Sequence, residues 1–409
     1  MKRLFATLLP ILLSAAAAAA PPEQPPGQRI QVLPGDLPAP YATPSKANHP
    51  RRVKRPDGAV LRVPDGFEAN LFATGLRHPR WLTVAANGDV LLSEPGIEEI
   101  TLLRDTDGDG VADIKSTFLS GFRDLRGLAI HGDSLYIADL KRVWRLPYRA
   151  GDLRNRAEPR PLTAAASLGD GEGHWSRLIA FAPDGRHFYV TVGSIDNIGE
   201  EPAPRATVQR FDADGGGQRT FAGGLRNPVG IAFRPGTAEP YVVVNERDGM
   251  GDDLVPDFLT RLVPDGFYGW PYAYIGANPH PGLADKRPDL VAKSIVPDLL
   301  FEAHSSPLGL VFYDGDGFPA AYRGDAFVAL HGSWNAATPR GYTIVRVPFE
   351  GDRPAGHYEI FASGFWDAGS GSAEVWGRPA GLAVAADGSL LVADDWGGAV
   401  WRISYTGTE

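Results

Sequence analysis

The chain has 409 residues, contains no cysteine and carries a net charge of −9 at pH 7. The absence of cysteine excludes disulfide bonds, zinc–thiolate sites, iron–sulfur clusters and covalently attached c-type haem. The excess of acidic residues offers no basic face of the kind that binds nucleic acid, so we expect no nucleic-acid partner.

The N-terminal segment has the pattern of a signal peptide. Lys2 and Arg3 precede an apolar stretch, residues 4–20, that ends in a run of alanines. This order predicts export and cleavage near Ala20, with an uncleaved anchor as the alternative. No later apolar run approaches the roughly 20 residues that a membrane-spanning helix needs. We therefore expect residues 1–20 to be a signal peptide and the protein to be secreted or periplasmic, with no membrane span.

The next segment, residues 21–61, is rich in proline and has a basic cluster at Arg51, Arg52, Lys54 and Arg55. This composition predicts an irregular lead-in rather than a folded domain. The rest of the chain is long enough for one large domain or two, and internal repeats decide between them.

A pattern of two short apolar strands joined by a turn recurs six times. The copies are LTVAANGDVLLSE from residue 82, LAIHGDSLYIAD from 128, LIAFAPDGRHFYVTVG from 178, IAFRPGTAEPYVVVNE from 231, LVFYDGDGFPAAYRGDAFVALHG from 310 and LAVAADGSLLVADD from 382. Asn-Gly and Asp-Gly pairs stand at several turns, where they tolerate the positive φ angles of tight hairpins. A third β-branched or apolar segment follows each pair. These segments are residues 101–104, 143–146, 208–211, 259–262, 344–347 and 400–403.

The spacing of the copies indicates the architecture. It is about the length of one four-stranded propeller blade, and the fourth and fifth intervals are long enough to hold insertions. No segment shows the sustained 3.6-residue period of a helix. The sequence therefore predicts an all-β fold, a six-bladed β-propeller with insertions in the fourth and fifth repeats, forming one catalytic domain over residues 62–406.

One position in this register is polar in every repeat. It lies four residues before each start, and its members are His78, Asp124, His174, Asn227, Ser306 and Arg378. Because the innermost strands of a propeller run side by side along its channel, these positions should converge at one mouth. Buried polar groups without partners are costly, so we expect a wet or ligand-filled mouth. Ordinary polar turn residues are the alternative.

Three of these junctions carry more functional groups than a turn requires. GLRNPVG holds Arg226 and Asn227, GEGHWSRL holds His174 and Arg177, and WGRPAG holds Arg378. Arginine presents a planar fork that suits carboxylates. A histidine with a near-neutral pKa is the usual base for a hydroxyl proton. Structural ion pairs or a core histidine are the alternative for each residue taken alone.

Two acidic, glycine-rich segments suit calcium, which prefers oxygen ligands on flexible loops. The first, residues 245–260, contains Glu246, Asp248, Asp252, Asp253 and Asp257. The second, residues 105–113, resembles an EF-hand loop with Asp105, Asp107, Asp109, Val111 and Asp113 at positions one, three, five, seven and nine. It has Ser116 where the bidentate Glu would stand, so we expect at most a structural site. A solvated loop and an Asp/Gly-rich turn are the respective alternatives.

Taken together, GLRNPVG, GEGHWSRL, the first acidic segment with PDGFYGWP (residues 264–271), and ADDWGGAVWRI (residues 393–403) resemble the soluble quinoprotein sugar dehydrogenases. The similarity covers nearly the whole mature chain and is greatest to the sorbosone and pyranose dehydrogenase branch. It implies a sugar or sugar aldehyde as substrate, with pyrroloquinoline quinone (PQQ) and Ca²⁺ as cofactors. It also implies an external electron acceptor, a quinone or a cytochrome, and we expect a monomer or homodimer.

The resemblance also implies roles for particular residues. His174 would be the general base, and Arg226 would bind the quinone and polarise the oxygen beside the carbon that accepts hydride. The other residues expected at the cofactor are Arg177, Asn227, His331, Trp334 and Arg378. Arg247 and Asp248 fall where the family supplies main-chain carbonyls to calcium. Asp252 and Asp253 follow in the acidic continuation.

Two rival functions remain open at this point. A calcium-dependent propeller lactonase or phosphotriesterase would need Glu, Asn and Asp ligands from several blades, whereas the polar ring here is richer in Arg and His. A non-catalytic interaction propeller would leave the combination of Arg-Asn, His and acidic loop unexplained. Nicotinamide chemistry is disfavoured because no G-x-G-x-x-G joins a strand to a helix.

Overall fold

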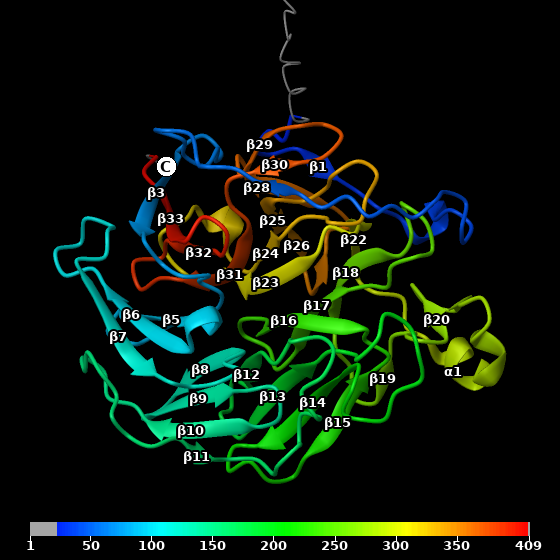
Figure 1. Cartoon of the computed structure of the whole chain (residues 1–409), viewed down its shortest axis with the longest axis horizontal. Coiled ribbons are helices and arrows are strands. Elements are labelled where there is room, and N and C mark those ends of the chain that lie inside the picture. The colour runs from blue at the N-terminus through cyan, green and yellow to red at the C-terminus, as the bar shows by residue number, and fades with distance from the viewer. Residues whose placement is uncertain (1–22, 408–409) are drawn as a thin grey trace, which may run out of the picture.

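The computed structural model describes residues 23–407, so the predicted signal peptide lies outside the described residues (Figure 1). Nearly all of the regular secondary structure of the described chain is β-strand. Its helical elements are η1 (Pro34–Asp36), η2 (Pro95–Ile97), η3 (Ala284–Lys286), α1 (Pro288–Lys293) and η4 (Ala320–Tyr322). Within residues 23–407, no helix has the length and apolar character needed to cross a membrane.

Most of the strands lie in six sheets of four or five strands each. The first three are β4–β5–β6–β7 (Leu82–Val84, Val90–Glu94, Glu99–Arg104, Ile114–Ser120), β8–β9–β10–β11 (Gly127–His131, Ser134–Ala138, Val143–Pro147, Arg160–Pro161) and β12–β13–β14–β15–β19 (Ile179–Phe181, His187–Val192, Thr207–Asp212, Arg219–Gly223, Gly266–Phe267). The others are β16–β17–β18–β22 (Asn227–Phe233, Pro240–Asn245, Pro256–Arg261, Leu299–Ala303), β23–β24–β25–β28–β1 (Pro307–Phe312, Ala326–Leu330, Thr343–Val347, Tyr358–Ala362, Arg29–Ile30) and β31–β32–β33–β3 (Pro379–Val384, Leu390–Asp394, Ala399–Tyr405, Phe67–Ala73).

The first strands of the six sheets form a closed ring. Strand β4 contacts β8, β8 contacts β12, and the contacts continue through β16, β23 and β31 back to β4. Glycines permit this close approach: a Cβ at Gly127 would lie 2.1 Å from the Arg177 carbonyl oxygen of the next sheet, and one at Gly309 would lie 2.3 Å from the Ala380 oxygen. Successive sheets radiate from this ring, which is the arrangement of a β-propeller (Figure 1).

Burial of apolar side chains between adjacent sheets holds the ring together. One cluster joins Leu91 and Leu102 of the first sheet to Leu135 and Ile137 of the second, and the other pairs of neighbours have equivalent clusters. Side chains alternate between the two faces of a strand, and each face of a sheet packs on a neighbouring sheet. Both faces of each sheet are therefore buried.

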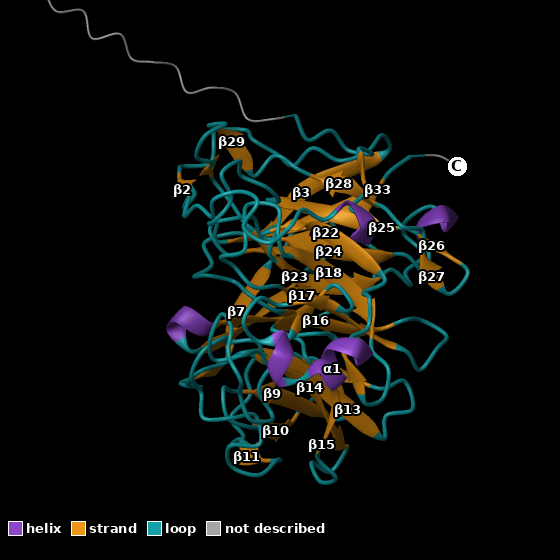
Figure 2. Cartoon of the chain, turned by 90° about the vertical axis from the view of Figure 1, so that its right-hand side faces the viewer, coloured by secondary structure: helices purple, strands orange, loops and turns teal. Residues whose placement is uncertain are grey.

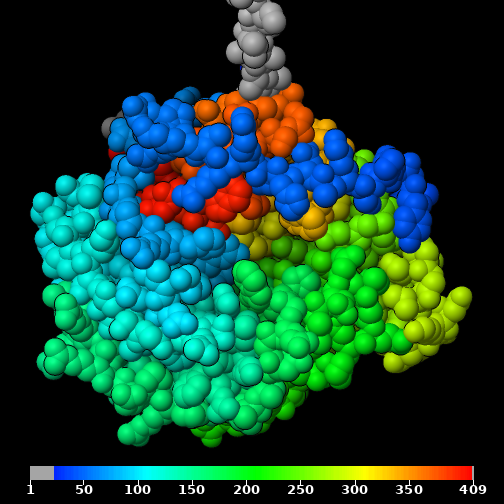
Figure 3. All heavy atoms as spheres, in the orientation of Figure 1, coloured from blue at the N-terminus to red at the C-terminus, as the bar shows by residue number. Residues whose placement is uncertain are grey.

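The N-terminal segment completes the last sheet. Strand β3 pairs with β33, so residues from both ends of the described chain lie in one sheet. The lead-in runs across the surface of the propeller (Figure 3) and contributes two short strands, β1 paired with β28 and β2 (Arg51–Arg52) paired with β30 (Glu374–Val375). Residues predicted to be an irregular lead-in thus contain ordered edge strands.

Three connections carry the remaining elements. Between β18 and β22 the chain forms β19, the hairpin β20–β21 (Ala273–Tyr274, Asn278–Pro279), η3 and α1. Helix α1 lies at the right-hand edge of the molecule in Figure 1 and therefore in front of the strands in Figure 2. The hairpin β26–β27 (Phe349–Glu350, Arg353–Pro354) precedes β28, and β29 (Trp366–Ala368) with β30 lies between β28 and β31.

Candidate active site

The loops that precede the inner strands enclose two adjoining hollows. The larger, which we call the central cavity, has a volume of about 530 Å³. The smaller, which we call the recess, has about 180 Å³. His174, Asn227, Asn245 and Ser306 line both. Four of the six ring residues line the central cavity, namely His78, His174, Asn227 and Ser306, whereas Asp124 and Arg378 line neither hollow.

Backbone strain marks three of these ring positions. His78, Asp124 and Ser306 adopt left-handed φ angles of 59°, 57° and 58°. Such angles are unfavourable for residues with a Cβ, and they are found most often where a site requires them. The chain therefore accepts the same local strain at three equivalent points around the mouth.

His174 lies at the junction of the two hollows. Its Nδ1 is 2.8 Å from the carbonyl oxygen of Ser194, to which it donates when the proton is on Nδ1. Burial, reinforced by the nearby charge of Arg226, lowers the pKa of His174 to about 4. The imidazole is therefore neutral at pH 7, with its proton on Nδ1 and its Nε2 left as an acceptor.

Arg226 lines the recess and is almost completely buried. Its guanidinium donates to the carbonyl oxygens of Glu246 (2.9 Å) and Asn197 (3.2 Å), and it forms an ion pair with Asp248 at 3.3 Å. Asn227 accepts a hydrogen bond from Ser176 Oγ at 2.7 Å. These contacts fix a cation and an amide beside His174.

Arg177 and Arg378 lie behind the walls of the hollows. Arg177 is fully buried and donates to the carbonyl oxygens of Leu140, His174 and Ser176. Arg378 donates to the carbonyl oxygen of His331 at 2.9 Å. Burial lowers the pKa of Arg177 to about 9 and that of Arg378 to about 10. Both arginines support main-chain segments that carry lining residues.

His331 and Trp334 do line the hollows, one in each. His331 contributes to the central cavity, and its Nε2 donates to the buried carboxylate of Asp395 at 2.9 Å. Asp395 also pairs with Arg80, another residue of the central cavity. Burial lowers the pKa of His331 to about 3. Trp334 lines the recess with 43% of its surface exposed and stacks on His49 of the lead-in.

The first acidic segment divides between the recess and the surface of the lead-in. Asp248 lines the recess, where Asn335 donates to it at 2.6 Å. Burial raises the pKa of Asp248, but contact with His304 and the charge of Arg226 outweigh this effect, so the net pKa is lowered. Asp252 and Asp253 instead form ion pairs with Arg340 outside both hollows.

Arg247, the other residue expected near calcium, directs its side chain away from the recess. Its guanidinium is fully buried, binds Glu246 at 2.9 Å and donates to the carbonyl oxygens of Pro271 and Ala273. Glu246 has a buried carboxylate oxygen, Oε1, with no hydrogen-bond partner among the described residues. The residues that line the recess thus include several with oxygen donors, the ligand type that Ca²⁺ prefers, although Arg247 already pairs with the carboxylate of Glu246.

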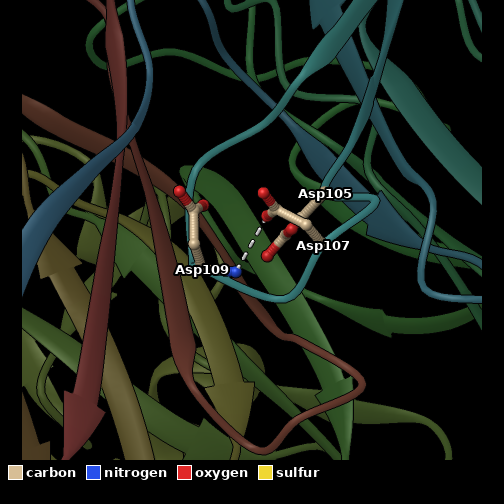
Figure 4. A group of neighbouring side chains, drawn as sticks. All are labelled: Asp105, Asp107 and Asp109. Atoms are coloured by element: carbon tan, nitrogen blue, oxygen red, sulfur yellow. Dashed lines mark hydrogen bonds between the residues drawn. The ribbon is translucent and has the colours of Figure 1, made fainter.

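The second acidic segment forms an exposed turn between β6 and β7. Carboxylate oxygens of Asp105, Asp107 and Asp109 lie within 4.8 Å of one another (Figure 4). Asp113 turns away to accept hydrogen bonds from the Thr106 main chain and hydroxyl, and Val111 donates its main-chain N–H to Asp109. The first three carboxylates are therefore brought together, and the other two predicted positions are not part of that group.

Several recess residues had no assigned role in the sequence interpretation: Asn245, Glu246, Asp257, His304 and Asn335. Asp257 accepts hydrogen bonds from the main chains of Glu246 and Ser306, and burial raises its pKa to about 7. His304 stands two residues before the ring residue Ser306. Glu246 and Asp257 belong to the acidic segment, but no sequence pattern indicates that they, rather than Asp252 and Asp253, line the recess.

Comparison with known proteins agrees with this architecture. The chain is 26% identical over 423 residues to the pyrroloquinoline quinone-dependent pyranose dehydrogenase of Coprinopsis cinerea, a match covering 84% of this chain and 54% of that protein. The chain thus spans about half the length of this relative. Its structure resembles the holo PQQ domain of the Coprinopsis pyranose dehydrogenase, with a TM-score of 0.72, 22% identity and coverage of 87% of this chain and 98% of the other.

A further solved structure is the calcium structure of a family AA12 protein from Trichoderma reesei, with a TM-score of 0.68, 20% identity and coverage of 85% and 97% of the two chains. The TrAA12-like family model matches residues 61–256 and 286–406. These findings confirm the resemblance to quinoprotein sugar dehydrogenases that the sequence motifs indicated. The chain belongs to the TrAA12-like family.

Proposed function

We propose that this protein is a quinoprotein that uses PQQ and Ca²⁺ to oxidise a sugar or sugar aldehyde. The observation that carries the proposal is His174, a neutral imidazole at the junction of two hollows. Its Nδ1 is held by Ser194, and its Nε2 accepts no hydrogen bond from the described residues. A base in this state can take a hydroxyl proton at neutral pH.

The lining of the recess suits a planar ligand that carries carboxylates. Arg226 provides a fixed guanidinium, Asn227 an amide, and Trp334 a half-exposed ring. Asn245, Asp248 and Asn335 line the same recess and carry the oxygen donors that Ca²⁺ prefers. We assign cofactor binding to Arg226, Asn227, His331 and Trp334, with Arg177 and Arg378 supporting the main chain around them.

Bound PQQ would supply a two-electron acceptor for hydride, and bound Ca²⁺ would supply positive charge. His174 Nε2 takes the proton of the substrate hydroxyl, whose carbon loses hydride and becomes a carbonyl carbon. Arg226 holds positive charge at a fixed place in a buried site, which is where such charge acts most strongly.

We place the calcium ion at the recess, near the main chain of Arg247 and Asp248, and not on the carboxylates of Asp252 and Asp253, which Arg340 neutralises. The Asp105–Asp113 turn is a candidate for a second, structural ion. Its three clustered carboxylates are exposed, so any effect of that ion on activity should be small.

The proposal also covers the number of blades, the site of action, the electron acceptor and the oligomeric state. The six sheets act as the blades of a six-bladed propeller over residues 62–406, and the long connections in the fourth and fifth repeats are insertions. The N-terminal pattern supports export to the periplasm or beyond. Electrons pass to an external quinone or cytochrome, and the protein acts as a monomer or homodimer.

A calcium-dependent hydrolase fits the site less well. Such an enzyme needs several carboxylates converging on one ion in the channel. Among residues 23–407, the group of three or more His, Asp or Glu side chains with this proximity is the surface turn at Asp105, Asp107 and Asp109. The carboxylates of Glu246, Asp248 and Asp257 belong to residues that line the recess, but the first two are paired with Arg247 and Arg226, and the third accepts main-chain hydrogen bonds. A buried arginine beside a neutral histidine favours the quinone.

The test is dye reduction by purified apo-protein with a panel of aldoses and ketoaldoses, with and without PQQ and Ca²⁺. We expect activity only when both are added, and loss of activity in chelator. Activity that is independent of PQQ, or no activity together with no change in PQQ absorbance on mixing, would refute the proposal. Hydrolysis of lactones by the same preparation would favour the hydrolase.

A further inference from the structure

An exposed tryptophan stands at the mouth of the central cavity. Trp175 lines the cavity with 65% of its surface exposed, which is unusual for so large an apolar side chain. The Arg126 guanidinium carbon lies 5.0 Å from the Trp175 ring centroid, a cation–π arrangement that orients the ring. Both residues line the central cavity, and neither lines the recess with Arg226.

The charged side chains that line this cavity are cationic. Its titratable lining residues are His78, Arg80, Arg126, His174 and His331. The described residues that line it include no carboxylate, although the whole chain has nine more acidic than basic residues. A hollow lined by one sign of charge attracts ligands of the opposite sign. His174 and His331 are neutral at pH 7 because burial lowers their pKa values to about 4 and about 3, and Arg80 is paired with Asp395. The positive charge that an anionic ligand meets in this cavity is therefore mainly that of Arg126.

The two arginines of the cavity, Arg80 and Arg126, differ in how closely a carboxylate neutralises their charge. Arg80 forms an ion pair with the buried carboxylate of Asp395. Arg126 approaches Asp124 only at 3.7 Å and makes no hydrogen bond with it. The Nε of Arg126 is buried and has no partner among residues 23–407. The charge of Arg126 is therefore only partly met by the described residues, and its side chain lines the cavity.

Trp175 and Arg126 together offer two complementary surfaces. The indole presents an apolar face of the kind that packs against the C–H face of a pyranose ring. The guanidinium beside it offers charge-assisted donors for a carboxylate. A pyranose that carries its own carboxylate satisfies both surfaces, whereas a neutral sugar leaves the arginine unmatched.

We propose that Arg126 and Trp175 form a subsite for acidic pyranoses, so that uronic acids are preferred over the neutral sugars of the same configuration. The inference rests on the proposed function, since it names the substrate class of the same cavity. Removing a charge-assisted hydrogen bond typically costs roughly 10- to 100-fold in affinity. We expect a preference of that size.

The first experiment compares glucuronate with glucose, and galacturonate with galactose, using protein reconstituted with PQQ and Ca²⁺. The expected result is a kcat/KM that is about tenfold or more higher for each uronate. In Arg126→Met this ratio should fall to near one. In Trp175→Ala the KM of the uronates should rise, and Trp175→Phe should recover most of the loss. Arg123→Met removes a charge from an exposed side chain nearby and should leave the ratio unchanged.

Equal kcat/KM for uronates and neutral sugars would overturn the inference. So would weakened PQQ titration in Arg126→Met with the substrate ratio unchanged, because Arg126 would then serve the cofactor. Calorimetric binding of glucuronate and glucose to the protein without turnover separates this inference from the proposed function. Glucuronate binding that Arg126→Met abolishes supports the subsite even if no sugar is oxidised, and its absence refutes it. Thermal unfolding of each variant checks that the fold is intact.

Discussion

At the scale of single residues, the protonation state of His174 decides what the site can do. Ser194 holds Nδ1, and burial keeps the ring neutral over the physiological range. Ordinary exposed histidine, with a pKa near 6.5, would be half protonated in mildly acidic water. The buried position therefore widens the pH range in which Nε2 is a base.

This state predicts a specific pH profile. Because burial lowers the pKa of His174 to about 4, the base form persists as pH falls through 6.5 and is lost only below about 4. We expect kcat/KM for sugar oxidation to show no inflection near pH 6.5. It should fall about tenfold per pH unit below the lowered pKa. Steady-state rates between pH 3.5 and 8, with PQQ saturating, check this. An inflection near 6.5 would mean that another group is the base.

Replacement of the base should separate catalysis from cofactor binding. His174→Ala should reduce kcat by roughly 100- to 10,000-fold, because the substrate proton loses its acceptor. PQQ titration should change little, since Arg226 and Asn227 remain. The matched control is His131→Ala, which removes a histidine that stacks on Phe181 outside both hollows. A rate in His174→Ala close to that of the parent protein would contradict the assignment.

At the scale of elements, the lead-in acts as a strap on the recess. Asn48 lies outside the strands. Its side-chain amide donates to the carbonyl oxygens of Ala336 (2.9 Å) and Gly371 (2.8 Å), and its main-chain N–H donates to the carbonyl oxygen of Trp334. Thr43 Oγ1 accepts a hydrogen bond from the main chain of Asp252. A segment that is distant in sequence thus holds two loops that border the recess.

Loss of this strap should loosen the loop that carries Trp334 and Asn335. In Asn48→Ala the carbonyl groups of Ala336 and Gly371 lose their donor, and each such bond is worth about 1 kcal/mol. We expect amide hydrogen exchange in residues 334–337 to quicken by roughly fivefold to tenfold. Gln31→Ala, which removes a lead-in amide that donates to the carbonyl oxygen of Gly356, is the control. Unchanged exchange in Asn48→Ala would show that the strap is dispensable.

At the scale of the whole molecule, stability depends on closing the ring. Strand β3 supplies the outer strand of the last sheet, and Phe67 at its start packs on residues of the fifth sheet and its loops. Its ring lies 4.8 Å from that of Phe318 and 5.1 Å from that of Phe361, both in edge-to-face geometry. One side chain therefore ties the N-terminal strand to a sheet that forms much later in the chain.

Truncation of Phe67 should weaken the closure. Phe67→Ala should lower the free energy of unfolding by about 3–5 kcal/mol, since it removes a buried ring and leaves a cavity. Phe67→Leu retains part of the volume and should lose less than half of that amount. Denaturant unfolding followed by tryptophan fluorescence gives both values. A loss of under about 1 kcal/mol in Phe67→Ala would mean that the closure carries little of the stability.

The sequence by itself determined the local structure and the family. Alternation and turn residues located the strands: the predicted segments 208–211 and 400–403 lie within β14 and β33, and the Asp-Gly pairs lie at hairpins. These features are local, because the side-chain period and the φ angles of a turn depend on adjacent residues. The register of the repeats also brought His174, Asn227 and Ser306 to the same hollow.

Only the tertiary structure decided which members of a motif face the site. Arg177 belongs to the same motif as His174, yet it turns behind the wall, and Asp252 pairs with Arg340 while Asp257 faces the recess. The hydrogen bonds of Asn48 join segments that no sequence repeat relates to each other. The same is true of the cation–π pair of Arg126 with Trp175. Such choices depend on which distant groups satisfy a buried charge or carbonyl, and a one-dimensional pattern does not contain that information.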